Sequence, residues 1–320
     1  MAKERINIQA LQGELEQALK LIRERSTTEE AKLSARPVPC LSSLANSDSL
    51  LERCADIVKT SDFGKPTLRV VRHLACSGGT LLSKCLAAMP NVYLLSELHP
   101  QTTLHMGGGK AKFLPADVAT QARYAGVPDV QALADEIFVA SVVCAHKHVT
   151  DRGGDLVVRA HSHSDYCVGP GLSVGCAVSR LLSEHFNIQS VATIRNPIDA
   201  YLSLIKNDWV HFEPRCFDEY CCRAIAFIED QNLIFSYERF VLDPVGQMKA
   251  ITSSLGLGYD DSFIDTFGAF NVTGDSGRSG DVIAHRPRQK IPNGLEEEVR
   301  TSRAYQQLLK LLKAKALMEG

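Results

Sequence analysis

The stretch Val191-Ala192-Thr193-Ile194-Arg195-Asn196-Pro197-Ile198-Asp199-Ala200-Tyr201-Leu202-Ser203 decides the fold. Its apolar start predicts a strand, and the proline predicts the first turn of a helix. Arg195 ends the strand, and Ser203 follows eight positions later. We therefore expect a guanidinium and a hydroxyl side by side at a strand-to-helix turn, where they could clamp a phosphate. In the alternative interpretation, Arg195 makes a surface salt bridge and Ser203 lies on a polar helix face.

Strands and helices alternate on both sides of this turn. Apolar runs bounded by turn residues predict strands over 68–74, 92–95, 156–158, 190–194 and 233–236. Helical periodicity predicts helices after the SGGT turn and over 128–147, 172–186, 197–207, 216–230, 244–255 and 295–317. This rhythm indicates a three-layer α/β/α fold with a central parallel sheet and with sites at the carboxyl ends of its strands.

The first 64 residues differ from the rest and predict a helical N-terminal extension with a linker, ahead of an α/β domain over 65–320. An amphipathic helix is expected over 5–25 and a short second helix over 48–59. These helices either pack on the main domain or form a contact with a partner, such as a homodimer.

Composition narrows the class of protein. A net charge of −2 in 320 residues argues against a general nucleic-acid binder. The chain has no apolar run as long as a membrane span, and its polar start lacks the core of a signal peptide, so we expect a cytoplasmic protein without a membrane span. The ten cysteines include no C-x-x-C pair, which favours reduced thiols over a metal site.

A second segment suited to anions follows the first strand of the domain. Ser77, Gly78, Gly79 and Thr80 combine a flexible backbone with two hydroxyls at a helix N-terminus. The segment is not a Walker A loop, because the G-x-x-x-x-G-K-[ST] spacing and its lysine are absent. The alternative is an ordinary strand-to-helix turn. Further on, the loop over 271–294 is long and rich in Gly, Pro and Arg, which is typical of a functional loop.

With the stretch from Tyr237-Glu238 through Asp243-Pro244 to Leu255-Gly256-Leu257, these segments resemble the sulfotransferases that use 3′-phosphoadenosine 5′-phosphosulfate (PAPS). The resemblance covers residues 68–260 and implies a P-loop-NTPase-like sulfotransferase fold and PAPS as the sulfuryl donor. It implies the following cofactor-binding residues: Ser77, Gly78, Gly79 and Thr80 at the 5′ end, Arg195 and Ser203 at the 3′-phosphate, Tyr237, and Arg278 in a lid.

One position departs from the family pattern. The family carries lysine or arginine just before its S-G pair, whereas this chain has Cys76. A missing cation should cost several kcal/mol of transition-state stabilisation. The candidates to replace it are Arg72, His73, Lys84, Arg159, Arg278, Arg286 and Arg288. Otherwise the protein is a catalytically inactive nucleotide-binding or scaffold relative.

Two residues at strand ends are candidates for the catalytic base. His161, in Arg159-Ala160-His161, resembles the histidine of the family's K-T-H motif, and its imidazole suits proton transfer near neutrality. Glu97 lies near the position where other sulfotransferases carry a catalytic glutamate. His163 and Asp165 could line the acceptor pocket.

The resemblance therefore predicts sulfuryl transfer by in-line displacement to a hydroxyl or amine of a small-molecule, glycan or peptide acceptor, without a metal. A P-loop phosphotransferase is a further alternative, disfavoured by the missing Walker lysine.

Overall fold

The computed structural model describes residues 64–102, 104, 117–172, 175–273, 282–284 and 287–318. The predicted helices over 5–25 and 48–59, and the partner contact assigned to them, lie outside the described residues. So does Arg278 of the predicted lid.

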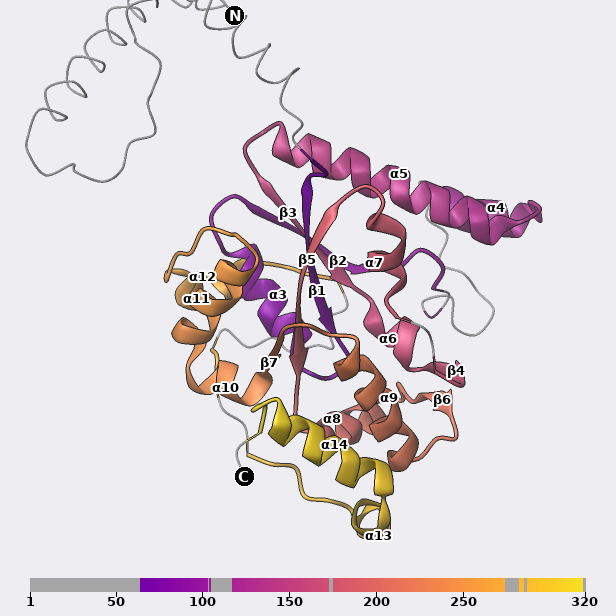
Figure 1. Ribbon diagram of the computed structural model, residues 1–320, viewed down its shortest axis with the longest axis vertical. Helices are drawn as coiled ribbons and strands as arrows, with labels where there is room; N and C mark the ends of the chain where they lie inside the picture. Colours follow the sequence, from indigo (N-terminus) through magenta and orange to yellow (C-terminus); the bar gives the residue numbers. More distant parts are fainter. Residues whose placement is uncertain are drawn as a thin grey trace, which may run out of the picture. The chain divides into compact units, whose positions relative to one another are not determined.

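The centre of the domain is a parallel sheet of five strands in the order β2-β3-β1-β5-β7 (Figure 1). The strands are β1 (Thr67–His73), β2 (Val92–Leu98), β3 (Asp155–Ala160), β5 (Asn187–Ile194) and β7 (Ile234–Ser236). β1 pairs with β5 along its whole length, with His73 opposite Thr193. The SGGT loop and the Arg195 turn therefore start side by side, at the carboxyl edge of the sheet.

Helices cover both faces of this sheet, which confirms the predicted three-layer architecture. Successive strand residues point to opposite faces. Val71 and Val157 pack with α3 (Gly79–Ala87) and α11 (Pro244–Ser254), whereas Val70 and Val158 pack with α5 (Val130–Thr150) and α7 (Ala177–Leu182). A third cluster joins α8 (Pro197–Lys206), α9 (Phe217–Glu229) and α14 (Arg303–Ala314). None of the described helices is long and apolar enough to cross a bilayer.

Several short elements have no clear sequence pattern. They are α4 (Val118–Ala125), α6 (Ser162–Tyr166), α10 (Tyr237–Leu242), α12 (Phe263–Thr266), the 3-10 helix η3 (Phe267–Ala269), and the strands β4 (Val168–Pro170) and β6 (His211–Glu213). β4 and β6 pair in parallel as a second, two-stranded sheet. Arg223 of α9, which is fully buried, donates to the carbonyls of Tyr166 and Gly169 and thereby holds this small sheet against α9.

Two predicted helices have different bounds. The single closing helix predicted over 295–317 was wrong, because Ser302 separates α13 (Asn293–Thr301) from α14. Ser302 has an extended backbone, its hydroxyl accepts from the Tyr305 amide at 2.9 Å, and it donates to Asp218 Oδ1 at 2.5 Å. The helix predicted over 172–186 is shortened to α7, since Cys176 before it is also extended.

Candidate active site

The loop between β1 and α3 exposes a helix N-terminus to the site. α3 begins after Gly78, and this N-cap residue has no side chain with which to cap the helix. Ser77 is buried, and its hydroxyl donates to the Leu74 carbonyl at 2.6 Å, so Ser77 shapes the loop rather than caps the helix. The start of α3 lines the cavity and carries the positive end of the helix dipole, which favours an anion there.

Two side chains pack so tightly against this loop that its glycines are required. Gly78 has a φ of +88°, and a Cβ placed there would overlap the Tyr237 ring. A Cβ at Gly79 would overlap the His73 ring. Cys76 also has a positive φ, +65°, which is uncommon for a residue with a side chain. Tyr237 and His73 thus support the loop from two sides.

Arg195 belongs to the same assembly. Its side chain is buried rather than part of a surface salt bridge, and Nη1 donates to the Cys76 carbonyl at 3.3 Å. The guanidinium carbon lies 5.2 Å from the centre of the Tyr237 ring, a cation–π distance. The structure therefore brings Arg195, Tyr237 and the β1–α3 loop together.

The amides at the start of α8 are already satisfied. The side-chain oxygen of Asn196 accepts from the amides of Ile198 and Asp199. Ser203, one turn further, donates to the Asp199 carbonyl at 2.8 Å and accepts from Gln289 Nε2 at 3.1 Å. Any phosphate at this turn would therefore be held by side chains and not by the α8 amides. Gln289 is a contact that the sequence did not indicate.

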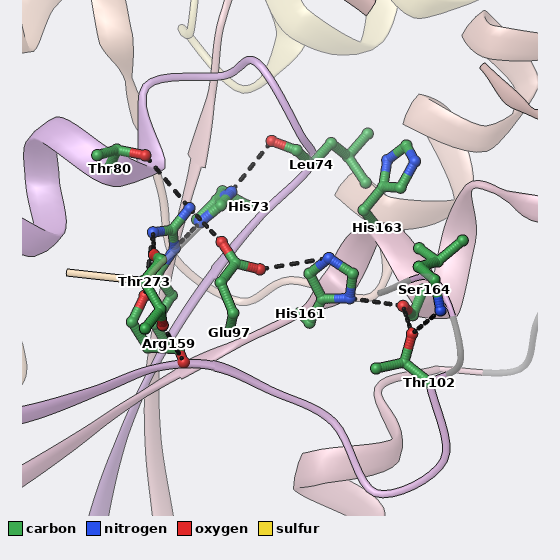
Figure 2. A network of polar contacts seen from close by, with 12 residues as sticks. His73, Leu74, Thr80, Glu97, Thr102, Arg159, His161, His163, Ser164 and Thr273 are labelled. Atoms are coloured by element: carbon green, nitrogen blue, oxygen red, sulfur yellow. Dashed lines mark hydrogen bonds and ion pairs between the residues drawn. The ribbon is translucent and has the colours of Figure 1, made fainter. Parts of the chain in front are cut away.

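The two candidate bases lie beside each other in one polar network (Figure 2). Glu97 Oε1 forms an ion pair with Arg159 Nη2 at 2.5 Å, and Glu97 Oε2 lies 3.3 Å from His161 Nε2. On its far side, His161 Nδ1 lies 2.5 Å from the Ser164 hydroxyl. Arg159 Nη2 also lies 3.5 Å from Thr80 Oγ1, so the network reaches the β1–α3 loop.

Burial shifts the pKa values of both candidate bases. Burial raises the pKa of Glu97, although the adjoining Arg159 charge opposes the rise. Burial, with the nearby His99 and Arg159, lowers the pKa of His161 to about 4. At neutral pH the imidazole is therefore uncharged, and the carboxylate beside it is a stronger base than an exposed glutamate.

Backbone geometry places Glu97 in this network. Its φ is +60°, and the pairing of β2 with β3 shifts register between Leu95 and Leu98. The strand predicted over 92–95 therefore continues through an irregularity to Leu98. A bulge of this kind turns a side chain toward a site, and the apolar alternation gives no sign of it.

A single cavity of about 1360 Å³ connects these groups. Gly78, Thr80, Arg195, Ser203 and Tyr237 line it, together with Glu97, Arg159 and His161. Its remaining walls include Thr102, Leu104, His163, Trp209 and His211.

The two predicted acceptor residues have different positions. His163 lines the cavity, and its Nε2 lies 3.1 Å from His211 Nδ1. Burial lowers the pKa of His163 to about 3. Asp165 is instead buried between elements, where Oδ1 accepts from the Ala177 amide and pairs with His99, each at 3.1 Å. Asp165 therefore has a structural position at the start of α7.

The candidate replacements for the missing cation also differ in whether they line the cavity. Arg72 is buried in an ion pair with Asp230 at 2.5 Å and does not line the cavity. Arg278 and Arg286 lie outside the described residues. Lys84 and Arg159 both line the cavity, and Arg159 contacts Thr80. No cluster of His, Cys, Asp and Glu in the described part of the chain is arranged to hold a metal ion.

Comparison with known proteins gives structural matches only. No family model and no curated protein matches the sequence. The sulfotransferase domain from the curacin biosynthetic pathway is 13% identical, with 78% of this chain and 98% of that domain covered and a TM-score of 0.49. The sulfotransferase domain of the Synechococcus PCC 7002 olefin synthase is 15% identical, covering 81% and 98%, with a TM-score of 0.45.

A mouse sulfotransferase, SULT7A1, solved in complex with PAP, is 12% identical, with 82% and 94% covered and a TM-score of 0.39. These solved sulfotransferase structures are what the chain is similar to.

Proposed function

We propose that this chain is a sulfotransferase that uses PAPS and transfers its sulfuryl group to a hydroxyl or amine. One observation carries the proposal. The N-terminus of α3, the Arg195 side chain and the Glu97–His161 pair all line the same cavity. This arrangement suits a nucleotide that carries phosphates at both the 3′ and the 5′ position of its ribose. It also suits an acceptor that lies beside the Glu97–His161 pair.

The residues present fit such a nucleotide. The α3 amides and the Thr80 hydroxyl would hold the 5′-phosphosulfate. Arg195 and Ser203 would hold the 3′-phosphate, with Arg195 braced by Tyr237 and by the Cys76 carbonyl. When bound, PAPS supplies the sulfuryl group and a 5′-phosphate that can leave with the electrons of the broken S–O bond.

The chain's own groups then divide the work. Glu97 takes the proton from the acceptor as the new bond forms, S–O for a hydroxyl or S–N for an amine, and the neutral His161 orients Glu97 from the other side. Negative charge that builds on the departing phosphate is met by the α3 amides, Thr80 and Arg159. Arg159 would in this way supply the positive charge that Cys76 lacks.

Calorimetry with 3′-phosphoadenosine 5′-phosphate (PAP) tests the cofactor. Wild-type protein should bind PAP, and Arg195→Ala should weaken PAP by about tenfold or more while weakening adenosine 5′-phosphate far less, because only PAP carries the 3′-phosphate. Arg215→Ala is the matched control, since Arg215 is exposed and pairs with Asp208 on the surface. A wild-type protein that does not bind PAP would overturn the proposal.

Turnover separates the alternatives. PAP binding without sulfuryl transfer to any of a panel of phenols, sugars and tyrosine peptides would identify a catalytically inactive relative. Magnesium-dependent ATP hydrolysis without PAP binding would identify a phosphotransferase instead.

A further inference from the structure

His73 stands at the end of β1 and joins two parts of the site. It is 5% exposed, and its ring fills the space that a Cβ at Gly79 would need. Its Nδ1 lies 3.1 Å from the Leu74 carbonyl, and its Nε2 accepts a short hydrogen bond from Arg159 Nε (Figure 2). His73 therefore contacts both the β1–α3 loop and Arg159.

The partners of His73 determine its protonation state. A carbonyl can only accept, so Nδ1 must carry the hydrogen, and a guanidinium can only donate, so Nε2 must be the bare nitrogen. A proton on Nε2 would abolish the Arg159 hydrogen bond and press two cations together. Burial and the Arg159 charge lower the pKa of His73 well below its usual value, which keeps this tautomer neutral.

Arg159 has a defined orientation as a result. Its Nε is fixed by His73, and its Nη1 donates to the Ser96 hydroxyl at 3.1 Å and to the Thr273 carbonyl at 3.2 Å. Its Nη2 is thereby directed to Glu97 and Thr80. Without His73, the planar guanidinium would lose its contact on the Nε edge and could turn away from Thr80.

We propose that His73 is a positioning residue that holds the Arg159 guanidinium against Thr80, at the place where the 5′-phosphosulfate would lie. The hydrogen bond between His73 and Arg159 follows from their geometry alone. The effect of His73 on turnover rests on the proposed sulfotransferase activity. His73 thus compensates, through Arg159, for the neutral Cys76 in the loop.

Nitrogen NMR of ¹⁵N-histidine-labelled protein tests the contact independently of activity. His73 should appear as the neutral Nδ1–H tautomer from pH 8 to pH 5, and Arg159→Met should move the Nε2 resonance while the Nδ1–H signal remains. An Nε2–H tautomer, a charged His73 at neutral pH or an unmoved Nε2 resonance would overturn the proposal.

Kinetics test the consequence with a matched pair of variants. The glutamine oxygen in His73→Gln can reach the position of Nε2, whereas the shorter side chain in His73→Asn cannot. We expect His73→Asn to lower kcat about 10–100-fold, the range for losing a group that orients a functional side chain, and His73→Gln to recover most of that loss. His148→Asn, an exposed position on α5, should behave as wild type.

A double-mutant cycle separates positioning from general damage to the fold. If His73 acts through Arg159, His73→Asn should lower kcat no further in the Arg159→Met background. An undiminished loss in that background would overturn the role, as would full activity of His73→Asn alone. If the wild type binds no PAP and transfers no sulfuryl group, the proposed function fails, and the NMR result alone decides whether His73 holds Arg159.

Discussion

The Glu97 carboxylate and the His161 imidazole lie 3.3 Å apart, Oε2 to Nε2, at the carboxyl ends of the neighbouring strands β2 and β3. The sequence offers the two residues as rival bases, and the structure makes them one unit. Burial raises the pKa of the Glu97 carboxyl and lowers that of the His161 imidazole, which reverses the usual order of the two values. A proton taken from an acceptor would therefore rest on Glu97, and the titration of Glu97 is coupled to that of the adjacent His161.

The pH dependence of turnover follows from these shifts. A base works when deprotonated, so activity is present above its pKa and is lost as the pH falls through it. The pKa of Glu97 is raised from its usual 4.5, and that of His161 is lowered from 6.5 to about 4. Because Glu97 is the proposed base, we expect kcat/KM to decline as the pH falls through its raised pKa, with a midpoint above 4.5. A decline centred near pH 4 would instead assign the base to His161, whose pKa is lowered to about 4.

The substitution Cys76→Lys tests which residue supplies the positive charge beside the departing phosphate. Because Arg159 already lies at Thr80, Cys76→Lys should change kcat by less than about tenfold in the wild type, whereas Arg159→Met should lower it by about 10²–10³. Cys76→Lys should partly rescue Arg159→Met, and Cys76→Met is the uncharged control. A large gain from Cys76→Lys in the wild type would show that Arg159 does not supply this charge.

The contact between Gly78 and Tyr237 predicts a selective effect of alanine. Gly78→Ala and Gly126→Ala both place a side chain at positive φ, which costs about 1–2 kcal/mol of folding free energy. Only at Gly78 does the added Cβ overlap a ring, which costs about 1–3 kcal/mol more. We expect PAP affinity to fall for Gly78→Ala and to remain unchanged for Gly126→Ala. Equal affinities in calorimetry would show that Tyr237 does not brace the loop.

Arg223 predicts a stability effect away from the reacting groups. It is fully buried, pairs with Glu219 at 2.8 Å and lies 5.0 Å from the centre of the Phe212 ring. Arg223→Met should lower the free energy of unfolding by about 3–5 kcal/mol, because it leaves the buried Tyr166 carbonyl, the part-buried Gly169 carbonyl and the Glu219 carboxylate without this donor. Arg215→Met, which removes an exposed pair, should cost about 0–1 kcal/mol in the same urea titration. Similar losses would contradict the structural role of Arg223.

Much of the sheet could be predicted from the sequence, because its signals are local. The apolar run before Arg195 and the proline after it mark β5 and α8, and the glycines after β1 mark the start of α3. The helix break at Ser302 has a weaker sequence signal. Serine favours helix N-caps, yet the helical periodicity on both sides of it conceals the break.

The contacts within the site could not be predicted, because they depend on strand order. His73 meets Arg159 only because β1 pairs with β3 across 86 residues of chain. Glu97 reaches His161 only because the backbone becomes left-handed at one residue of β2. Neither the order of strands nor a single positive φ leaves a periodic trace in the sequence.

The place of β2 in the sheet has a consequence for how the protein responds to heat. In the described sheet β2 is an edge strand, bonded to β3 alone, while β3 and β1 lie inside. Edge strands open locally at lower free energy than interior ones. Glu97 therefore lies on β2, the strand that opens first, whereas His161 follows β3, the strand that stays paired. Warming should inactivate the protein while its central strands still resist hydrogen exchange, so thermal inactivation would precede melting.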